Sequence, residues 1–110
     1  VHRVVCAIDC GTVVNPGTVA QQVESSVNFA LTAALFGQID IQDGVVQQTN
    51  FTNYPLVSMA QSPKVETWIV PSTHPPEGVG EPAVPPLAPA VANAMFKLTG
   101  QRIRSLPLKA

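Results

Sequence analysis

Residues 15–37, NPGTVAQQVESSVNFALTAALFG, decide the fold, because they combine helical periodicity with a start signal and a stop signal. The Asn15 side chain can cap the first turn, and Pro16 suits the first helical position, where its missing N–H is not needed. Gly37 predicts a left-handed residue that ends the helix. Between these ends, apolar residues recur three and four positions apart, at Val23, Val27, Ala30, Leu31, Ala34 and Leu35. The stretch therefore predicts an amphipathic helix with one face to bury.

Strand-like sequence lies on both sides of this helix. Residues 2–8 are mostly β-branched or small, which predicts a strand covered on both faces. Residues 38–42 and 45–50 alternate around Asp43-Gly44, a pair that favours the type I′ turn of a β-hairpin. Residues 65–70 are again rich in β-branched side chains and predict a further strand.

A long loop and a second helix complete the predicted fold. Residues 71–89 hold seven of the eleven prolines, which predicts a stiff loop without helix or strand. Helical spacing returns from Leu87 to Leu98, Gly100 follows as the expected end, and residues 102–106 predict a short final strand. The predicted order is β-α-β-β-β-α-β. This is an α+β fold in which two helices pack on one side of a mostly antiparallel sheet.

The composition predicts one domain, residues 1–110, that is partly covered by other protein. Apolar residues make up 45% of the chain, but charged residues make up only 12%, about half of the roughly 25% usual for soluble domains. Free domains present mixed charges to water, so this low charge indicates a piece of a larger protein. The sequence also opens at Val1 directly in strand-like residues, which fits a piece. A small, neutral, Pro-rich monomer is the alternative.

The charge, the hydropathy and the spacing of Cys and His residues limit the kinds of partner that the chain can bind. A net charge of −1 with scattered Lys and Arg lacks the clustered basic face that nucleic acid needs. No apolar run reaches the roughly 18 residues that cross a bilayer, which predicts a soluble chain. The compartment, a bacterial-type cytoplasm or periplasm, stays open. Cys6 and Cys10 are predicted to be buried small residues rather than a disulfide or metal pair. His2 and His74 lack a partner at a ligand spacing, so no metal ligand is predicted.

The long loop contains the motif PPEGVGEP, residues 75–82. Gly78 and Gly80 would allow unusual backbone conformations and close approach to a ligand, and Pro82 would fix the direction of the chain. A carboxylate on such a rigid, poorly solvated support suits a general base, which makes Glu81 the candidate catalytic residue. On the residues alone, a loop glutamate that bonds to nearby backbone N–H groups remains open.

Two ordered blocks resemble a known family. The sequence GVGEPAVPP at 78–86, followed by APAVANA at 88–94, is similar to the final active-site segment of molybdenum hydroxylases. The residues at 9–11, 15–16 and 22–24 resemble another stretch of the same subunits, and the similarity extends over nearly the whole chain. The chain thus resembles the C-terminal segment of the molybdenum-binding large subunit of the xanthine oxidase family. The isoquinoline 1-oxidoreductase beta subunit and its aldehyde dehydrogenase relatives form the branch that it resembles most.

The resemblance implies a reaction, a cofactor and partners. The reaction would hydroxylate an N-heterocycle or an aldehyde with oxygen from water and pass a hydride to the molybdenum centre. The cofactor would be molybdopterin, as the cytosine dinucleotide, with molybdenum. The partners would be the remainder of the same large subunit, a small [2Fe-2S] iron–sulfur subunit and a small-molecule substrate. The fragment alone is expected to be inactive.

The resemblance also assigns roles to residues. Glu81 would be the general base, Gly78, Val79 and Gly80 would lie against the cofactor through their backbone, and Gln22 would offer its amide to the cofactor. For Gln22, the role of a merely exposed helix residue stays open. Glu24, next to Gln22, could support the site residues indirectly, but a glutamate in an early turn also stabilises its helix through the helix dipole, and this second role is favoured. Ser26 and Ala30 stand where this branch usually has glycine. The alternative function is a non-catalytic binding module that presents the Pro-rich loop to a peptide.

Overall fold

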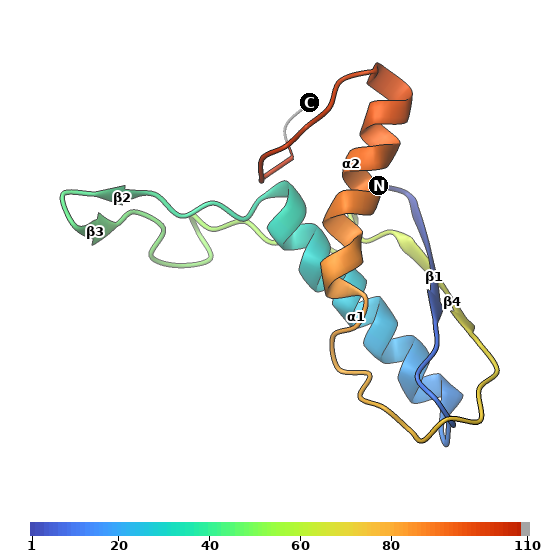
Figure 1. The fold of residues 1–110 in the computed structure, drawn as a ribbon. Coiled ribbons are helices and arrows are strands. Elements are labelled where there is room, and N and C mark those ends of the chain that lie inside the picture. The colour runs from blue at the N-terminus through green and yellow to red at the C-terminus, as the bar shows by residue number, and fades with distance from the viewer. Residues whose placement is uncertain (109–110) are drawn as a thin grey trace.

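The computed structural model describes residues 1–108 (Figure 1). The elements in chain order are β1 (Arg3–Ile8), α1 (Pro16–Leu35), β2 (Ile41–Gln42), β3 (Val45–Val46), β4 (Lys64–Ile69) and α2 (Val84–Thr99). Helix α1 runs through the centre of the molecule, with α2 crossing it and the β1 and β4 strands at its side. The hairpin of β2 and β3 projects away from this body.

Helix α1 forms as its sequence predicts. The Asn15 side chain accepts a hydrogen bond from the Thr18 backbone N–H at 3.1 Å, and Pro16 occupies the first turn. The buried face consists of Val19, Val23, Ser26, Val27, Ala30, Leu31 and Ala34. The end differs from the prediction, because Gly37 is not left-handed. Glycine is needed there for another reason, since a Cβ at Gly37 would lie 2.9 Å from the carbonyl oxygen of Ala33.

The sheet of the body is a parallel pair, so the prediction of a mostly antiparallel sheet is wrong for the described residues. Strands β1 and β4 pair in parallel, from Arg3 opposite Lys64 to Ile8 opposite Ile69. A parallel pair requires a long crossover connection, and α1 with the projecting hairpin supplies it. The β2 and β3 strands pair only with each other, so no described strand joins the two sheets.

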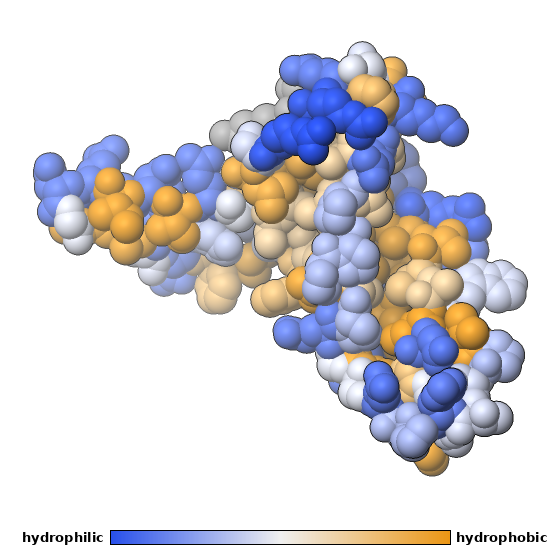
Figure 2. Space-filling model, viewed as in Figure 1, coloured by the Kyte–Doolittle hydropathy of each residue, from blue (hydrophilic) through white to orange (hydrophobic). Residues whose placement is uncertain are grey.

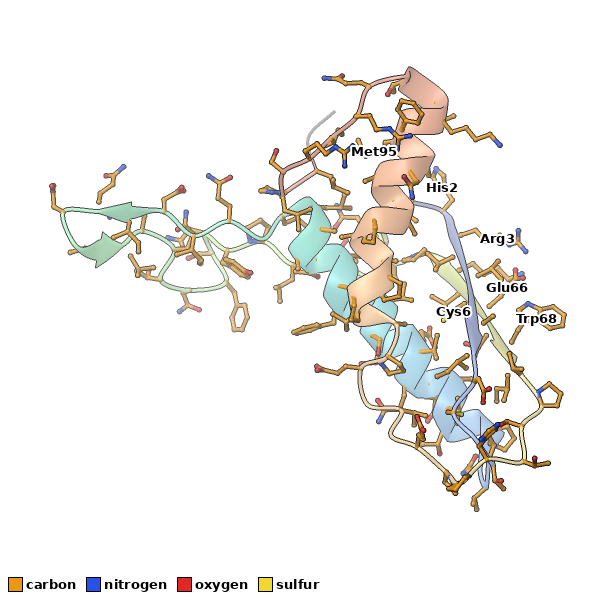
Figure 3. All side chains as sticks on the ribbon, viewed as in Figure 1. His2, Arg3, Cys6, Glu66, Trp68 and Met95 are labelled. Carbon is orange, nitrogen blue, oxygen red and sulfur yellow. The ribbon has the colours of Figure 1, made fainter. Side chains whose placement is uncertain are left out.

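Only one face of the β1–β4 pair is covered by the described residues, whereas the sequence of residues 2–8 predicted a strand covered on both faces. The inward residues pack against the helix core, namely Val4, Cys6, Ile8, Val65 and Ile69. The outward face carries Val5, which is 50% exposed, and Trp68, which is 65% exposed. In Figure 3, Trp68, Glu66 and Arg3 point away from the helices. Cys10 is buried as predicted, while Cys6 is only partly buried, and both thiols are free.

The hairpin has the predicted turn but shorter strands. Asp43 and Gly44 both have positive φ, of 51° and 78°, as a type I′ turn requires. Each strand pairs over only two residues, and Ile41, Val45 and Val46 are exposed. Figure 2 shows these apolar side chains on the projecting arm. No described segment of the body covers these apolar side chains on the arm.

Helix α2 begins earlier than predicted, inside the proline-rich stretch. Pro85 and Pro86 follow Val84 in the first turn, where backbone N–H groups have no helical acceptor, so proline is tolerated. Gly100 ends the helix at φ 74°, as expected. The predicted strand at 102–106 is absent from the described residues. The chain instead docks on α1, because the Leu108 N–H donates to the Ala34 carbonyl at 2.7 Å and Leu108 is buried.

An ion cluster on the outward face of the sheet predicts a pH dependence. Arg3 binds both carboxylate oxygens of Glu66, at 3.0 and 2.8 Å, and Lys64 lies 3.1 Å away. Hydrogen bonds from Arg3 and then Lys64 lower the pKa of Glu66 to about 2. The stabilisation is therefore complete above the ordinary pKa of 4.5 and is lost as the pH falls towards 2.

We expect Glu66→Gln to lower the free energy of unfolding of the full-length protein near neutral pH, because it removes the carboxylate that Arg3 and Lys64 bind. The difference from the unsubstituted protein should be constant at about pH 6 and above and should be much smaller at about pH 3, which lies between the ordinary pKa of 4.5 and the lowered pKa of about 2. Denaturant titrations at both pH values measure this, with the exposed Glu24→Gln as control. A difference that does not change with pH would refute the assignment.

Candidate functional site

The candidate site lies at one edge of the parallel pair. The loop after β1 and the loop after β4 both leave from the carboxyl ends of their strands, so they meet at the same edge. Ligands of open sheets with parallel strands bind at this kind of edge. Both sequence blocks with the family resemblance start in these loops. The structure therefore brings together two segments that are about 65 residues apart in the chain.

At Gly11 the loop after β1 packs directly against the backbone of the loop after β4. Its φ is +73°, and a Cβ at this position would overlap the carbonyl oxygen of Pro75 and lie 3.0 Å from that of His74. The Thr12 N–H donates to the His74 carbonyl at 2.9 Å, and the Glu77 N–H donates to the Cys10 carbonyl at 3.0 Å. Sequence reasoning gave Gly11 no role of its own. Its position in a block that resembles the family was the available signal.

The second half of the loop is held by α1. The hydroxyl of Ser26 donates to the Gly80 carbonyl at 3.3 Å. Val79 packs against the core, and Ala83, at the entry to α2, is 4% exposed. The loop is therefore attached to the body before and after its glycines, as a rigid support requires.

Glu81 follows Gly80 and is exposed. Its backbone carbonyl accepts a hydrogen bond from the Val84 N–H at 3.1 Å, which begins the turn into α2. The poorly solvated surroundings expected for this carboxylate are not supplied by the described residues. The hollow at this edge, about 380 Å³, is lined by Asp9, Pro71, Ser72, Thr73 and His74, and Glu81 does not border it.

Gly78 and Gly80 do not use the conformational freedom that sequence suggested. Neither has a left-handed φ, both are exposed, and a Cβ on either would meet no atom within 4 Å. Because both residues lack a side chain, their backbone is open to the surface. This arrangement leaves room for another group to approach the chain closely.

Gln22 lies on α1 one turn before Ser26, so both residues share one side of the helix. It is partly exposed, and its amide makes no hydrogen bond within residues 1–108. Glu24 is exposed and contributes its backbone carbonyl to the Asn28 side chain at 3.0 Å. The structure thus places Gln22 on the helix that holds the Glu81 loop, without a direct contact between Gln22 and that loop.

The described residues contain neither a metal-binding cluster nor a helix of membrane-spanning character. Among residues 1–108, no three side chains of His, Cys, Asp or Glu are placed to hold a metal ion. Within the same residues, neither helix has the length and hydropathy of a bilayer span.

Known proteins are similar to this chain over nearly its whole length. Residues 1–63 match the family model of the molybdopterin cofactor-binding domain. The beta subunit of isoquinoline 1-oxidoreductase from Brevundimonas diminuta is 37% identical over 99% of the chain, and a nicotinate dehydrogenase subunit from Pseudomonas putida is 36% identical over all of it. A membrane-bound aldehyde dehydrogenase from Gluconacetobacter polyoxogenes is 32% identical over 98%. The chain spans only 14%, 9% and 14% of these three relatives.

Solved structures agree with the sequence relatives. A Cu,Mo-dependent CO dehydrogenase has a TM-score of 0.77 at 28% identity, over 92% of this chain and 14% of its own. A quinoline 2-oxidoreductase from Pseudomonas putida has a TM-score of 0.83 over 94% of this chain and 14% of its own, and its 22% identity supports the fold alone. The predicted family is confirmed. The chain belongs to the molybdopterin cofactor-binding domain family, which forms part of the molybdenum-binding large subunits of xanthine-oxidase-family enzymes.

Proposed function

We propose that residues 1–110 form one subdomain of a molybdenum hydroxylase and contribute Glu81 as the general base of its active site. The observation that carries this proposal is the attachment of the Glu81 loop at the carboxyl edge of β1 and β4. A base must be held in fixed geometry relative to the group that it deprotonates, and this loop is fixed at both ends. The chain-wide similarity to molybdenum enzymes supports the same role.

Residues of the loop and of α1 offer groups that would suit the cofactor. The open backbone of Gly78 and Gly80 would accept a flat, polar group at close range, and the unbonded amide of Gln22 offers both a donor and an acceptor. Val79, between the glycines, packs inward and keeps their backbone at the surface. When bound, molybdopterin with molybdenum supplies water activation and a two-electron acceptor.

Glu81 would take up the proton that is released when oxygen from water is added to the substrate carbon. Its carboxylate is exposed in this chain, so other segments of the protein must cover it and exclude water. The outward face of the sheet, with Val5 and Trp68 exposed, is a surface that the remainder of the large subunit would cover. The low charge of the chain, at 12%, agrees with such burial.

The substrate class would be an N-heterocycle or an aldehyde. Two relatives are named for N-heterocyclic compounds, isoquinoline and nicotinate, and a third for aldehydes. A small [2Fe-2S] subunit would carry the electrons onward. The alternative, a module that presents the Pro-rich loop to a peptide, gains no support, because the backbone at His74, Glu77 and Gly80 is already bonded to the body.

Cofactor analysis of the full-length protein tests the binding part of the proposal. We expect about one molybdenum per large subunit, and acid release should yield a pterin and cytidine monophosphate in comparable amounts. Metal analysis and mass spectrometry of the released nucleotide measure both. A folded full-length protein, expressed in a host that makes the cofactor, that carries neither molybdenum nor pterin would overturn the proposal.

A further inference from the structure

Ser26 is the one buried polar side chain in the described part of the chain, with 2% of its surface exposed. It lies in the middle of α1, between Val23 and Val27, which are at most 1% exposed, and faces the core rather than water. A hydroxyl removed from water requires a hydrogen-bond partner. Its partner is the Gly80 carbonyl, 54 residues later in the chain, at 3.3 Å.

This bond differs from the hydrogen bonds that the side chains of Thr32 and Asn28 donate on the same helix. The Thr32 hydroxyl donates to the Asn28 carbonyl at 3.2 Å, and the Asn28 amide donates to the Glu24 carbonyl at 3.0 Å. Both donated bonds follow the usual local pattern, in which the side chain returns to the carbonyl four residues earlier. Each side chain also accepts a bond from another segment, Thr32 from the Val57 N–H at 3.1 Å and Asn28 from the Ser62 hydroxyl at 2.7 Å. Ser26 could donate in the same local way to Gln22, but its hydroxyl instead reaches across to the loop. The bond therefore joins two elements rather than stabilising a single helix.

The bond acts on the peptide unit next to the proposed base. The Gly80 carbonyl and the N and Cα atoms of Glu81 belong to one planar peptide group. Fixing the carbonyl oxygen therefore restricts the direction in which the Glu81 side chain leaves the backbone. Between the Glu77 N–H and the start of α2, the Ser26 hydroxyl makes the hydrogen bond that attaches the backbone of residues 78–82 to the described body.

We propose that Ser26 is a positioning residue, which orients Glu81 through the Gly80 carbonyl. This inference rests on the proposed role of Glu81 as a base. Ser26 is buried and bonds to the Gly80 carbonyl, so its effect would be exerted through that carbonyl. At 3.3 Å the bond is longer than the usual O–H···O distance, so the expected effect is moderate.

The test is Ser26→Ala in the full-length enzyme, which removes the hydroxyl and suits a helix. We expect kcat to fall by about 3-fold to 10-fold, because small displacements of a catalytic group slow the chemical step. KM and molybdenum content should stay within about 2-fold, since uniform binding is not altered. Ser25→Ala is the matched control, because Ser25 is the preceding residue on the same helix and is exposed. Equal kcat values for the two variants would overturn the inference.

A double-mutant cycle separates positioning from a general loss of structure. In the Glu81→Gln background there is no base to orient, so Ser26→Ala should change the residual kcat by less than about 2-fold. The same fold loss in both backgrounds would mean that Ser26 acts without Glu81 and would overturn the inference. Near-normal kcat for Glu81→Gln alone would instead overturn the proposed function. Ser26→Cys, which keeps a weak donor of similar size, should recover part of the kcat that Ser26→Ala loses.

Discussion

Gly11→Ala is expected to lower the free energy of unfolding of the full-length protein by about 2–5 kcal/mol. Placing alanine in a left-handed backbone conformation costs about 1–2 kcal/mol, and forcing its Cβ into a filled space costs about 1–3 kcal/mol. The left-handed φ of +73° disfavours any side chain, and the new Cβ would overlap the Pro75 carbonyl oxygen. Neither neighbour is a flexible side chain end, so the two loops must separate. We therefore expect a lower unfolding temperature together with reduced molybdenum content. Thermal unfolding and metal analysis of the purified protein measure the two effects.

Gly44→Ala is the matched control for this prediction. Gly44 has a φ of +78°, nearly that of Gly11, but a Cβ there would meet no atom within 4 Å. Alanine at Gly44 should therefore lose only the backbone contribution, about 1–2 kcal/mol. The difference between the two variants isolates the contact between the loops. Equal unfolding temperatures for both variants would show that the loops do not pack as described.

Glu81→Gln is expected to lower kcat of the full-length enzyme by about 10²-fold to 10⁴-fold, the usual contribution of a positioned general base. Glutamine keeps the shape of the side chain but cannot take up a proton. Molybdenum content and unfolding temperature should remain near those of the unsubstituted enzyme, because the exposed carboxylate makes no ion pair within the described residues. Steady-state kinetics at saturating substrate measure the loss.

Glu77→Gln controls for a charge effect on the same loop. Glu77 is exposed, carries the same carboxylate and lies four residues before Glu81. Its attachment to the body runs through its backbone N–H, which bonds to the Cys10 carbonyl and is unaffected by the substitution. We expect kcat to stay within about 2-fold, since only the proposed base takes part in proton transfer. Comparable losses in both variants would argue for loop charge and against a specific base.

Local signals predicted the elements that depend on local physics. The cap at Asn15, the apolar spacing of α1 and the positive φ of Asp43 and Gly44 follow from neighbouring residues, and the structure contains all three. Strand pairing depends on segments far apart in the chain. Residues 65–70 look the same whether they join a parallel or an antiparallel partner, so the parallel pairing with β1 was not predictable from pattern.

The prolines near α2 show that composition alone does not predict where a helix begins. Seven prolines in residues 71–89 predicted loop throughout, yet Pro85 and Pro86 fit a helix start, where position matters more than count. Residues 102–106 were predicted as a short final strand. The final segment instead closes on the end of α1 through Leu108, a contact that depends on the packing of the whole body.

For the candidate site too, local features were predictable from the sequence and long-range contacts were not. Glu81 was identified from a rigid loop and a family resemblance, both readable in the sequence. The contacts that hold this loop could not be predicted from the sequence, because they join residues far apart in the chain. Gly11 lies against Pro75, about 64 residues later, and Ser26 bonds to Gly80, 54 residues later. Ser26 attracted notice only as a departure from glycine. Its burial and its partner became visible once the loop was placed beside α1.

Anaerobic single-turnover reduction of the full-length enzyme by its substrate tests the central claim most directly. Without an electron acceptor, the observed rate reports the chemical step and excludes later electron transfer and reoxidation. The account predicts that Glu81→Gln, with normal molybdenum content, is reduced at least about 10²-fold more slowly than Glu77→Gln. Reduction of both variants at the rate of the unsubstituted enzyme would contradict it.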